Sequence, residues 1–390
     1  MDQLVLSFND IPLILVIFQS LLFAILLVVA DIGNRRVNLL LAGFILALGL
    51  DAFDTLIYWS PSIKGAYLQG HIHIFYWLKF SVYLAAPLLY LYVKAVIHSD
   101  YEFSRRDLRH FIPLAAFPVL MFALYASLTP EERVLGITQY GLLYSKPAFQ
   151  FHLWARHLLY LGYGFASLRL LHQYQEELKQ RFSNMDKIDV FWLKLLTGGF
   201  LAIWCWVFAS YLLTLLNYSM WLGNIIGIAG NIFSFVFINT LVLYSIAKAN
   251  HGKREVRAEM VVEPIDVKPL SDAQDAAVVE QINQWMAQTR LFLDPELTLE
   301  QLAESVKLSP RRISNAINRH SGQNFFDYIN SFRVKTAVAI LTERGMDANM
   351  LDVIADAGFN SKSTFYRAFK RVMNMSPTEF CDQLAREKNP

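Results

Sequence analysis

MLDVIADAGFNSKSTFYRAFKRVMN, residues 350–374, contains two helical patterns joined by a short polar turn. The first pattern is apolar and includes Ala355, and a small residue there would let two helices cross closely. The second pattern is basic: from Asn360 to Arg371 it holds four Lys or Arg residues and no acidic residue. A short helix, a tight turn and a basic second helix are typical of a helix-turn-helix, whose second helix can enter the major groove of DNA.

The same layout occurs earlier, in LTLEQLAESVKLSPRRISNAINRHSG, residues 297–322. Ala303 takes the place of the small residue, and four bases without an acid lie between Lys307 and Arg319. Residues 272–390 as a whole carry 14 basic and 15 acidic side chains, so the positive charge is concentrated on the two expected second helices. This distribution favours contact with phosphates and base edges over a generally charged surface.

Helix-end signals support the same interpretation. Thr298 with Gln301, and Ser376 with Glu379, have the spacing of a capping box, in which two side chains satisfy the first backbone amides of a helix. No strand-like alternation follows residue 272. We therefore expect a soluble, wholly helical segment over 272–390, with helix-turn-helix elements at about 297–321 and 350–373.

These two stretches, the connecting NFFDYINSFRVKTAVAIL and the ending GFNSKSTFYRAFKRVMNMSPTEF resemble the DNA-binding domain of AraC-type (AraC/XylS) transcription regulators, over about residues 285–382. The resemblance implies two helix-turn-helix elements on either side of a linker helix, reading adjacent major-groove segments of double-stranded DNA. Carried over by position, the base-reading residues are Arg311, Ser314, Asn315, Lys362, Ser363 and Arg367. The residues expected to meet phosphates are Arg312, Arg319, Lys370 and Arg371.

The chain departs from this family at Asn374-Met375, where members often have glycine before the last Ser/Thr-Pro. Asparagine tolerates the left-handed backbone conformation, so we expect the same turn. The phenylalanines of this region are expected to form the core and not to stack on bases; they are Phe325, Phe326, Phe359, Phe365, Phe369 and Phe380.

The first 250 residues are of a different kind. Apolar runs near the length needed to cross a bilayer recur at roughly 11–30, 37–59, 72–97, 108–128, 151–171, 191–217 and 221–247. We interpret residues 1–250 as a bundle of about seven transmembrane helices and the polar, proline-containing residues 251–271 as a linker. The fold class is thus all-α: a polytopic membrane bundle followed by a soluble double helix-turn-helix domain.

Basic residues in the connecting loops indicate the orientation. The connections after the first, third and fifth runs are the more basic ones and should face the cytoplasm, which places the N-terminus outside and the C-terminus inside. The polar extension HQYQEELKQRFSNMDKID, residues 172–189, would then face the cytoplasm. It could contact the DNA-binding domain or the same element of a second subunit.

Ionisable residues inside membrane helices are costly and point to function by default. The polar residues that stand out in or beside the expected spans are Asp51, Asp54, His71, His73, Lys79, Arg156, His157, Asn224 and Asn231. They allow two interpretations: structural ion pairs and interhelical hydrogen bonds, or a pocket for a small signal molecule. His71 and His73 lack a third ligand at diagnostic spacing, so we expect no metal site and no cofactor.

The leading hypothesis is a membrane-embedded one-component transcription regulator in a bacterial cytoplasmic (inner) membrane, acting as a homodimer. Its expected partners are double-stranded DNA, lipids and an unknown signal. The expected spans contain no nucleophile–base pair and no phosphate loop, so no catalytic residue is proposed and the protein is not expected to be an enzyme. Two alternatives remain open: a transporter or membrane enzyme with an autoregulatory DNA-binding domain, and a constitutive regulator merely anchored to the membrane.

Overall fold

The computed structural model describes residues 7–8, 10–29, 34–68, 76–98, 101–138, 140–185, 190–216, 220–250, 272–345 and 349–388. Regular structure in these residues is helical, apart from one isolated antiparallel bridge between Phe182 and Thr298. The all-α fold class is therefore confirmed. The predicted linker, 251–271, lies outside the described residues.

The chain divides into two compact units. The N-terminal unit comprises residues 1–172 and 190–260, and the C-terminal unit comprises residues 173–189 and 261–390. The C-terminal unit therefore includes the end of a helix that begins in the other unit. We call residues 173–185 the α9 tail.

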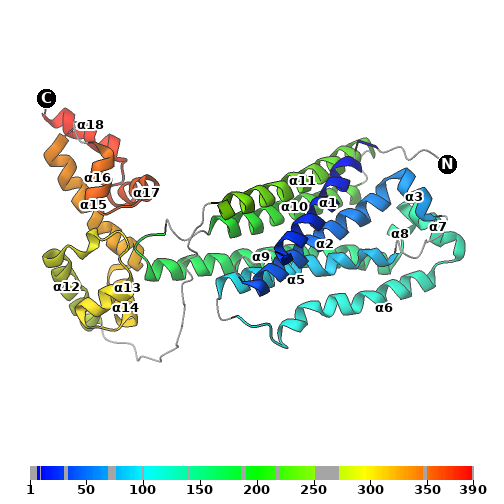
Figure 1. Cartoon of the computed structure of the whole chain (residues 1–390), viewed down its shortest axis with the longest axis horizontal. Coiled ribbons are helices and arrows are strands. Elements are labelled where there is room, and N and C mark those ends of the chain that lie inside the picture. Colours follow the sequence, from blue (N-terminus) through cyan, green and yellow to red (C-terminus); the bar gives the residue numbers. More distant parts are fainter. Residues whose placement is uncertain are drawn as a thin grey trace. The chain divides into compact units, whose positions relative to one another are not determined.

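Helices make up the N-terminal unit, and Figure 1 shows most of the long ones running alongside one another. They are α1 (Asp10–Val29), α2 (Arg35–Trp59), α3 (Pro61–Leu68), η1 (Leu78–Ser81), α5 (Val82–Ile97), η2 (Asp107–Phe111), α6 (Ile112–Ser127), α7 (Pro130–Thr138), α8 (Tyr140–Tyr144), α9 (Pro147–Arg181), α10 (Phe191–Leu215) and α11 (Met220–Asn250).

Six helical segments among the described residues are long and apolar enough to cross a membrane. They are Asp10–Val29, Arg35–Trp59, Leu78–Ile97, Asp107–Ser127, Phe191–Leu215 and Trp221–Tyr244. The seventh predicted span, 151–171, forms part of α9, which is not among these six. Their outer faces carry exposed apolar side chains such as Phe18, Val119 and Phe122, as expected of helices that face lipid. The number of spans and their orientation stay predictions.

Polar side chains link helices inside the N-terminal unit. Gln19 and Asn239 exchange amide hydrogen bonds of 3.0 and 3.1 Å, which join α1 to α11. The Trp192 Nε1–H group donates to the Tyr92 hydroxyl at 2.8 Å and joins α10 to α5. Interhelical hydrogen bonds of this kind are typical where apolar surfaces alone give little specificity.

The C-terminal unit contains a second set of helices, shown from yellow to red in Figure 1. They are α12 (Asp272–Thr289), η3 (Leu291–Leu293), α13 (Leu299–Val306), α14 (Pro310–Ser321), α15 (Phe325–Arg344), α16 (Met350–Asp356), α17 (Lys362–Met373) and α18 (Pro377–Lys388). Helices α13 and α14 form the first helix-turn-helix, and α16 and α17 form the second. The long helix α15 connects them.

Each helix-turn-helix has its own core. The first core includes Leu302, Ile313 and Ile317, and the second includes Phe365 and Phe369, all fully buried. The six phenylalanines expected in the core are buried or packed against it, so that prediction is confirmed. Burial of this kind, at about 25 cal/mol per Å² of apolar surface, holds each basic helix at a fixed angle to its partner.

The helix ends follow the sequence signals. Both capping boxes form: Thr298 and Gln301 exchange hydrogen bonds of 2.8 and 3.2 Å, as Ser376 and Glu379 do at 2.6 and 3.2 Å. Asn374 adopts the left-handed conformation (φ 55°) that the sequence predicted.

The small residue of the second helix-turn-helix is not the expected one. Ala355 is exposed, whereas Ala357 is fully buried between the helices. The reason is that α16 ends at Asp356, and the turn that follows folds Ala357 and Gly358 inward.

Candidate functional sites

Helix α14 presents a polar face opposite its buried one. Arg311, Ser314, Asn315 and Asn318 follow the spacing i, i+3, i+4, i+7, which puts them on one side of a helix. Ser309 caps the helix by accepting from the Arg312 amide at 3.3 Å, and Pro310 starts it. The helix is thereby fixed so that its polar side can approach base edges.

The polar face of α14 is occupied by the α9 tail. The Gln180 side-chain oxygen accepts hydrogen bonds from the Ser314 hydroxyl at 3.1 Å and from the side-chain amide of Asn318 (Nδ2) at 3.0 Å. Ser314 and Asn315 are half-buried, while Arg311 remains exposed. Ser314, one of the predicted base-reading residues, thus already has a protein partner.

Helix α17 differs in that its polar face is exposed in the part of the chain that the structure describes. Lys362, Ser363, Arg367 and Lys370 are exposed, opposite the buried face that includes Phe365. Ser361 caps the helix through the Thr364 amide at 3.3 Å. Bases and a hydroxyl along one side of a helix can contact base acceptors, and Arg367 can bridge the two acceptors of guanine.

Predicted phosphate-contacting arginines form ion pairs within their own domain. Arg319 lies 3.6 Å from the buried carboxylate of Asp275 on α12, and Arg371 pairs with Asp327 on α15. Both arginine side chains remain nearly half exposed. Arg312 is less accessible, since its Nε atom is buried. The two pairs orient Arg319 and Arg371 and leave guanidinium surface for a phosphate.

A buried arginine contacts both halves of the domain: besides the hydrogen bonds that follow, its guanidinium carbon lies 5.9 Å from the ring centre of Phe359, which belongs to the second core. Arg333 of α15 is 1% exposed and donates from Nε to the Phe292 carbonyl at 2.7 Å and from Nη2 to the Asp294 carbonyl at 2.7 Å. Burial lowers the pKa of Arg333 to about 10, with Asp294 and Glu296 acting in the opposite direction. The side chain therefore stays charged at neutral pH and needs all of its acceptors.

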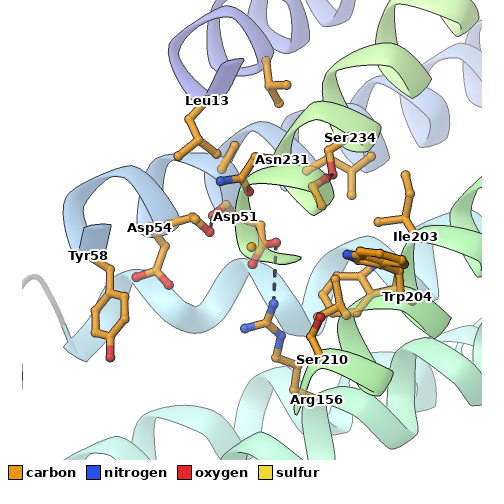
Figure 2. Close-up of a pocket in the computed structure, with 18 of the residues that line it drawn as sticks. Leu13, Asp51, Asp54, Tyr58, Arg156, Ile203, Trp204, Ser210, Asn231 and Ser234 are labelled. Carbon is orange, nitrogen blue, oxygen red and sulfur yellow. Dashed lines mark hydrogen bonds and ion pairs between the residues drawn. The ribbon is translucent and has the colours of Figure 1, made fainter. Parts of the chain in front are cut away.

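The N-terminal unit contains a partly open pocket of about 300 Å³. Figure 2 shows Asp51, Asp54 and Tyr58 of α2 on one side, with Trp204 of α10 and Asn231 of α11 among the other lining residues. The wall is mixed: aromatic and aliphatic side chains surround a small number of charged ones. Ligand pockets commonly have this composition.

Two acids and two bases from distant parts of the sequence meet at this pocket. The Lys79 ammonium donates to both Asp54 oxygens, at 3.1 and 2.9 Å, and both side chains are about one-tenth exposed. Arg156 is less well paired: its Nη2 atom lies 4.0 Å from an Asp51 oxygen (Figure 2). The predicted charge network is therefore brought together, but its two pairs are unequal.

Arg156 has a second contact, with an aromatic ring. Its guanidinium carbon lies 4.9 Å from the centre of the Trp204 ring, a cation–π distance. Its buried Nε atom has no hydrogen-bond partner among the described residues. A half-satisfied guanidinium next to an aromatic wall is a suitable place for an anionic or polar group of a small molecule.

The remaining predicted residues lie elsewhere. His157 is buried and stacks on Tyr211, with ring centres 4.7 Å apart, so it supports the packing of α9 on α10. His71 and His73 lie outside the described residues, as does the side chain of Asn224. No cluster of three potential metal ligands occurs in the described part of the chain.

The sequence did not identify Trp204 as a pocket residue, and it did not predict that Gln180 of α9 contacts α14. Trp204 resembles many other membrane aromatics in the sequence, and only the fold brings it to Arg156. For the polar extension at 172–189, contact with the DNA-binding domain was one of two alternatives, and the structure shows it.

Comparison with known proteins addresses the C-terminal part of the chain. A helix-turn-helix domain family matches residues 302–383. The melibiose operon regulatory protein of Escherichia coli K12 is 30% identical over 122 residues, which is 30% of this chain and 40% of that protein. The transcriptional regulatory protein HptR of Staphylococcus aureus is 24% identical over 102 residues, 26% of this chain and 39% of that protein.

The chain therefore covers about two-fifths of the length of these relatives, and the matches leave most of the N-terminal unit unaddressed. No solved structure matches the chain. Within the matched region, both helix-turn-helix elements, the connecting α15 and the basic faces of α14 and α17 agree with the resemblance inferred from the sequence. The C-terminal part of this protein is an AraC-type helix-turn-helix domain.

Proposed function

We propose that this protein is a membrane-embedded one-component transcription regulator that detects a small molecule in its N-terminal unit. The observation that carries the proposal is the joining, in one chain, of an AraC-type DNA-binding domain to six span-like helices, five of which line a charged pocket. Signal detection and gene regulation would then need no second protein. The proposal gives the protein no catalytic role.

The pocket supports the sensing part of the proposal. A structural ion pair needs no cavity, and the Asp54–Lys79 pair with its two short hydrogen bonds fits that role. Arg156, in contrast, is poorly paired and lines an open volume of about 300 Å³. A ligand that binds there would shift the protein between states only if it binds one state more tightly than the other.

The same features support the proposed location and partners. The exposed apolar helices support a position of the N-terminal unit in a lipid bilayer, and contact with a chromosome requires the DNA-binding domain to be in the cytoplasm of a bacterium. Helix-turn-helix proteins commonly act on paired half-sites, so we propose a homodimer on double-stranded DNA.

Crosslinking of the full-length, membrane-embedded protein to chromosomal DNA, followed by sequencing, tests the proposal. We expect discrete sites that are lost in the Arg311→Ala, Arg367→Ala double variant. The matched control is Arg386→Ala, an exposed arginine on α18 outside both DNA-reading helices, which should retain the sites. Sites retained by the double variant would contradict the assignment of base readers, and no enrichment at all would contradict DNA binding.

The sensing part has a separate test. A reporter gene placed behind a recovered site is measured in Arg156→Ala and Arg169→Ala cells grown on different carbon sources. Arg156→Ala should abolish the response to conditions while keeping the same DNA sites, and Arg169→Ala serves as a control from the same helix. If a single unrelated span in place of residues 1–172 and 190–250 leaves regulation unchanged, the N-terminal unit is only an anchor.

A further inference from the structure

We propose that the α9 tail is an autoinhibitory latch that holds the DNA-reading face of α14 closed. The inference rests on the proposed function in that it assumes the C-terminal domain binds DNA. It adds a means of control: the protein's own chain competes with DNA for the first helix-turn-helix. The second helix-turn-helix is left open.

The latch has a specific docking site. Ser183 is fully buried, its amide and hydroxyl both donate to the Leu297 carbonyl, at 3.2 and 2.6 Å, and the adjacent Phe182 forms the isolated bridge with Thr298. Leu178, one turn earlier, is also fully buried. Buried polar contacts of this number mark a defined interface and not a chance approach of a polar helix.

Arg333 contributes to the same site. Its guanidinium donates to the Ser183 carbonyl at 3.1 Å and to the Ser183 hydroxyl at 3.0 Å. Departure of the tail would leave these buried N–H groups for water to satisfy. A charged donor that loses a buried acceptor is penalised strongly, so the docked position is favoured and well defined.

Gln180 supplies the blocking contact. It lies one turn before Ser183 and accepts from both Ser314 and Asn318, which belong to the polar face of α14. The major groove is about 12 Å wide and an α-helix with its side chains is about 10–12 Å across, so the groove admits one helix and not two packed together. Docked tail and bound DNA therefore exclude each other at this face.

With this competition, the apparent DNA affinity equals the affinity of the open state multiplied by the fraction of molecules whose latch is open. The open second helix-turn-helix could still contact DNA through α17 when the latch is closed. Binding by one element alone would be weak and would read only half of the sequence. Release of the latch would add the second half of the site.

The connection to the sensing part is covalent. Helix α9 runs without interruption from Pro147 to Arg181, and it carries both Arg156 of the pocket and Gln180 of the latch. A ligand that changes how α9 is held in the N-terminal unit would thus act on a helix whose end contacts the reading helix. If α9 shifts and the tail leaves α14, the polar face of α14 becomes available to DNA.

The first test measures DNA affinity of the full-length protein in lipid nanodiscs, using a labelled duplex recovered from the chromosomal crosslinking. Gln180→Ala removes two hydrogen bonds that exist only in the closed state, so we expect DNA to bind more tightly by about 5- to 30-fold. Gln173→Ala, an exposed glutamine of the same tail, should leave the affinity unchanged. Equal or weaker binding by Gln180→Ala would overturn the latch.

The second test closes the latch chemically. Phe182 and Thr298 pair across an antiparallel bridge, and residues directly opposite in such a pair have Cβ atoms about 4.5–5.5 Å apart, near the distance a disulfide spans. The Phe182→Cys, Thr298→Cys protein should lose at least about 10-fold in DNA affinity when oxidised and regain it on reduction. Wild-type protein with its native Cys205 and Cys381, treated alike, is the control.

The two tests separate the latch from the proposed function. If the reduced and the Gln180→Ala proteins both fail to bind any recovered DNA, the proposed function is wrong. Hydrogen exchange of residues 178–184, which needs no DNA, then decides the latch alone. Faster exchange in Gln180→Ala than in Gln173→Ala supports it, and equal exchange overturns it.

Discussion

The two helix-turn-helix elements share a layout and differ in what covers them. On α17 the predicted base-reading side chains Lys362, Ser363 and Arg367 are exposed, whereas on α14 the α9 tail binds Ser314 through Gln180. Their turns differ too: Lys307 ends α13 in the left-handed conformation, and glycine takes that conformation after α16. Two similar stretches of sequence thus give one exposed polar surface and one covered surface, because, among the described residues, the α9 tail binds the polar face of α14 and not that of α17.

The largest expected effect is on stability and concerns Arg333, which contacts both halves of the C-terminal domain. Arg333→Leu should destabilise the C-terminal domain by about 3–5 kcal/mol, because it leaves the Phe292 and Asp294 carbonyls and Ser183 without their buried donor. Thermal unfolding with limited proteolysis of the full-length protein measures this. Lys335→Leu, an exposed position on the same helix, is the control. Loss of order in only one half would show that Arg333 does not join them.

The turns offer a second comparison. Gly358 has φ +82°, and a Cβ there would lie 2.8 Å from backbone atoms of Leu293, so Gly358→Ala should cost about 2–4 kcal/mol. Lys307→Gly, at the equivalent turn of the first element, relieves a left-handed non-glycine residue and should be neutral or stabilising by up to about 1 kcal/mol. Denaturant titration of both variants checks the opposite signs. Equal effects would mean that the two turns are not under different constraints.

Base readers on the two elements should respond differently to the latch. Arg367→Ala should reduce specific DNA affinity by about 1–3 kcal/mol whether or not Gln180 is present, since α17 is open. Arg311→Ala should have a larger effect in the Gln180→Ala background than in the wild type, because α14 reads DNA only when uncovered. A double-mutant cycle on a recovered duplex measures this coupling. If neither Arg311 nor Arg367 is coupled to Gln180, the prediction that the latch affects only the first helix-turn-helix is wrong.

The smallest effects are expected for the phosphate-contacting arginines. Arg371→Ala removes a partly exposed ion pair with Asp327 and should change stability by about 0–1 kcal/mol. Arg319→Ala removes the ion-pair partner of the buried Asp275 carboxylate and should destabilise the domain by about 1 kcal/mol. Each should weaken binding to all duplexes alike and lower the salt slope of log K by about 1. Titrations at several salt concentrations, with Arg386→Ala for comparison, check this. An effect on one sequence only would reassign that arginine to base reading.

Much of the C-terminal domain could be predicted because its signals are local. Capping boxes, the left-handed Asn374, the apolar faces and the clustered bases are recognised within a few residues, and each depends on interactions inside one helix or turn. The misassigned Ala355 shows the limit. Helix α16 ends one residue later, and a shift of one or two positions at a helix end moves a side chain from the buried to the exposed face.

The charged residues of the N-terminal unit were identifiable singly, because an ion in an apolar run is costly. Their pairing was not. Asp54 meets Lys79 closely and Asp51 meets Arg156 at 4.0 Å because of how α2, η1 and α9 pack, and helical periodicity says nothing of which helices are neighbours. The same holds for Trp204, whose ring reaches Arg156 from α10.

Local sequence signals were enough to establish the helical class, the apolar runs, the double helix-turn-helix and the basic faces of its second helices. They were enough because helix periodicity, capping and charge are properties of short segments. Only the tertiary structure determined that a polar segment near residue 180 covers one of those faces, because this contact depends on how whole helices pack. That contact joins Gln180 to Ser314 and Asn318, 134 and 138 positions away in the chain, and no pattern within a short segment specifies a contact over such a separation.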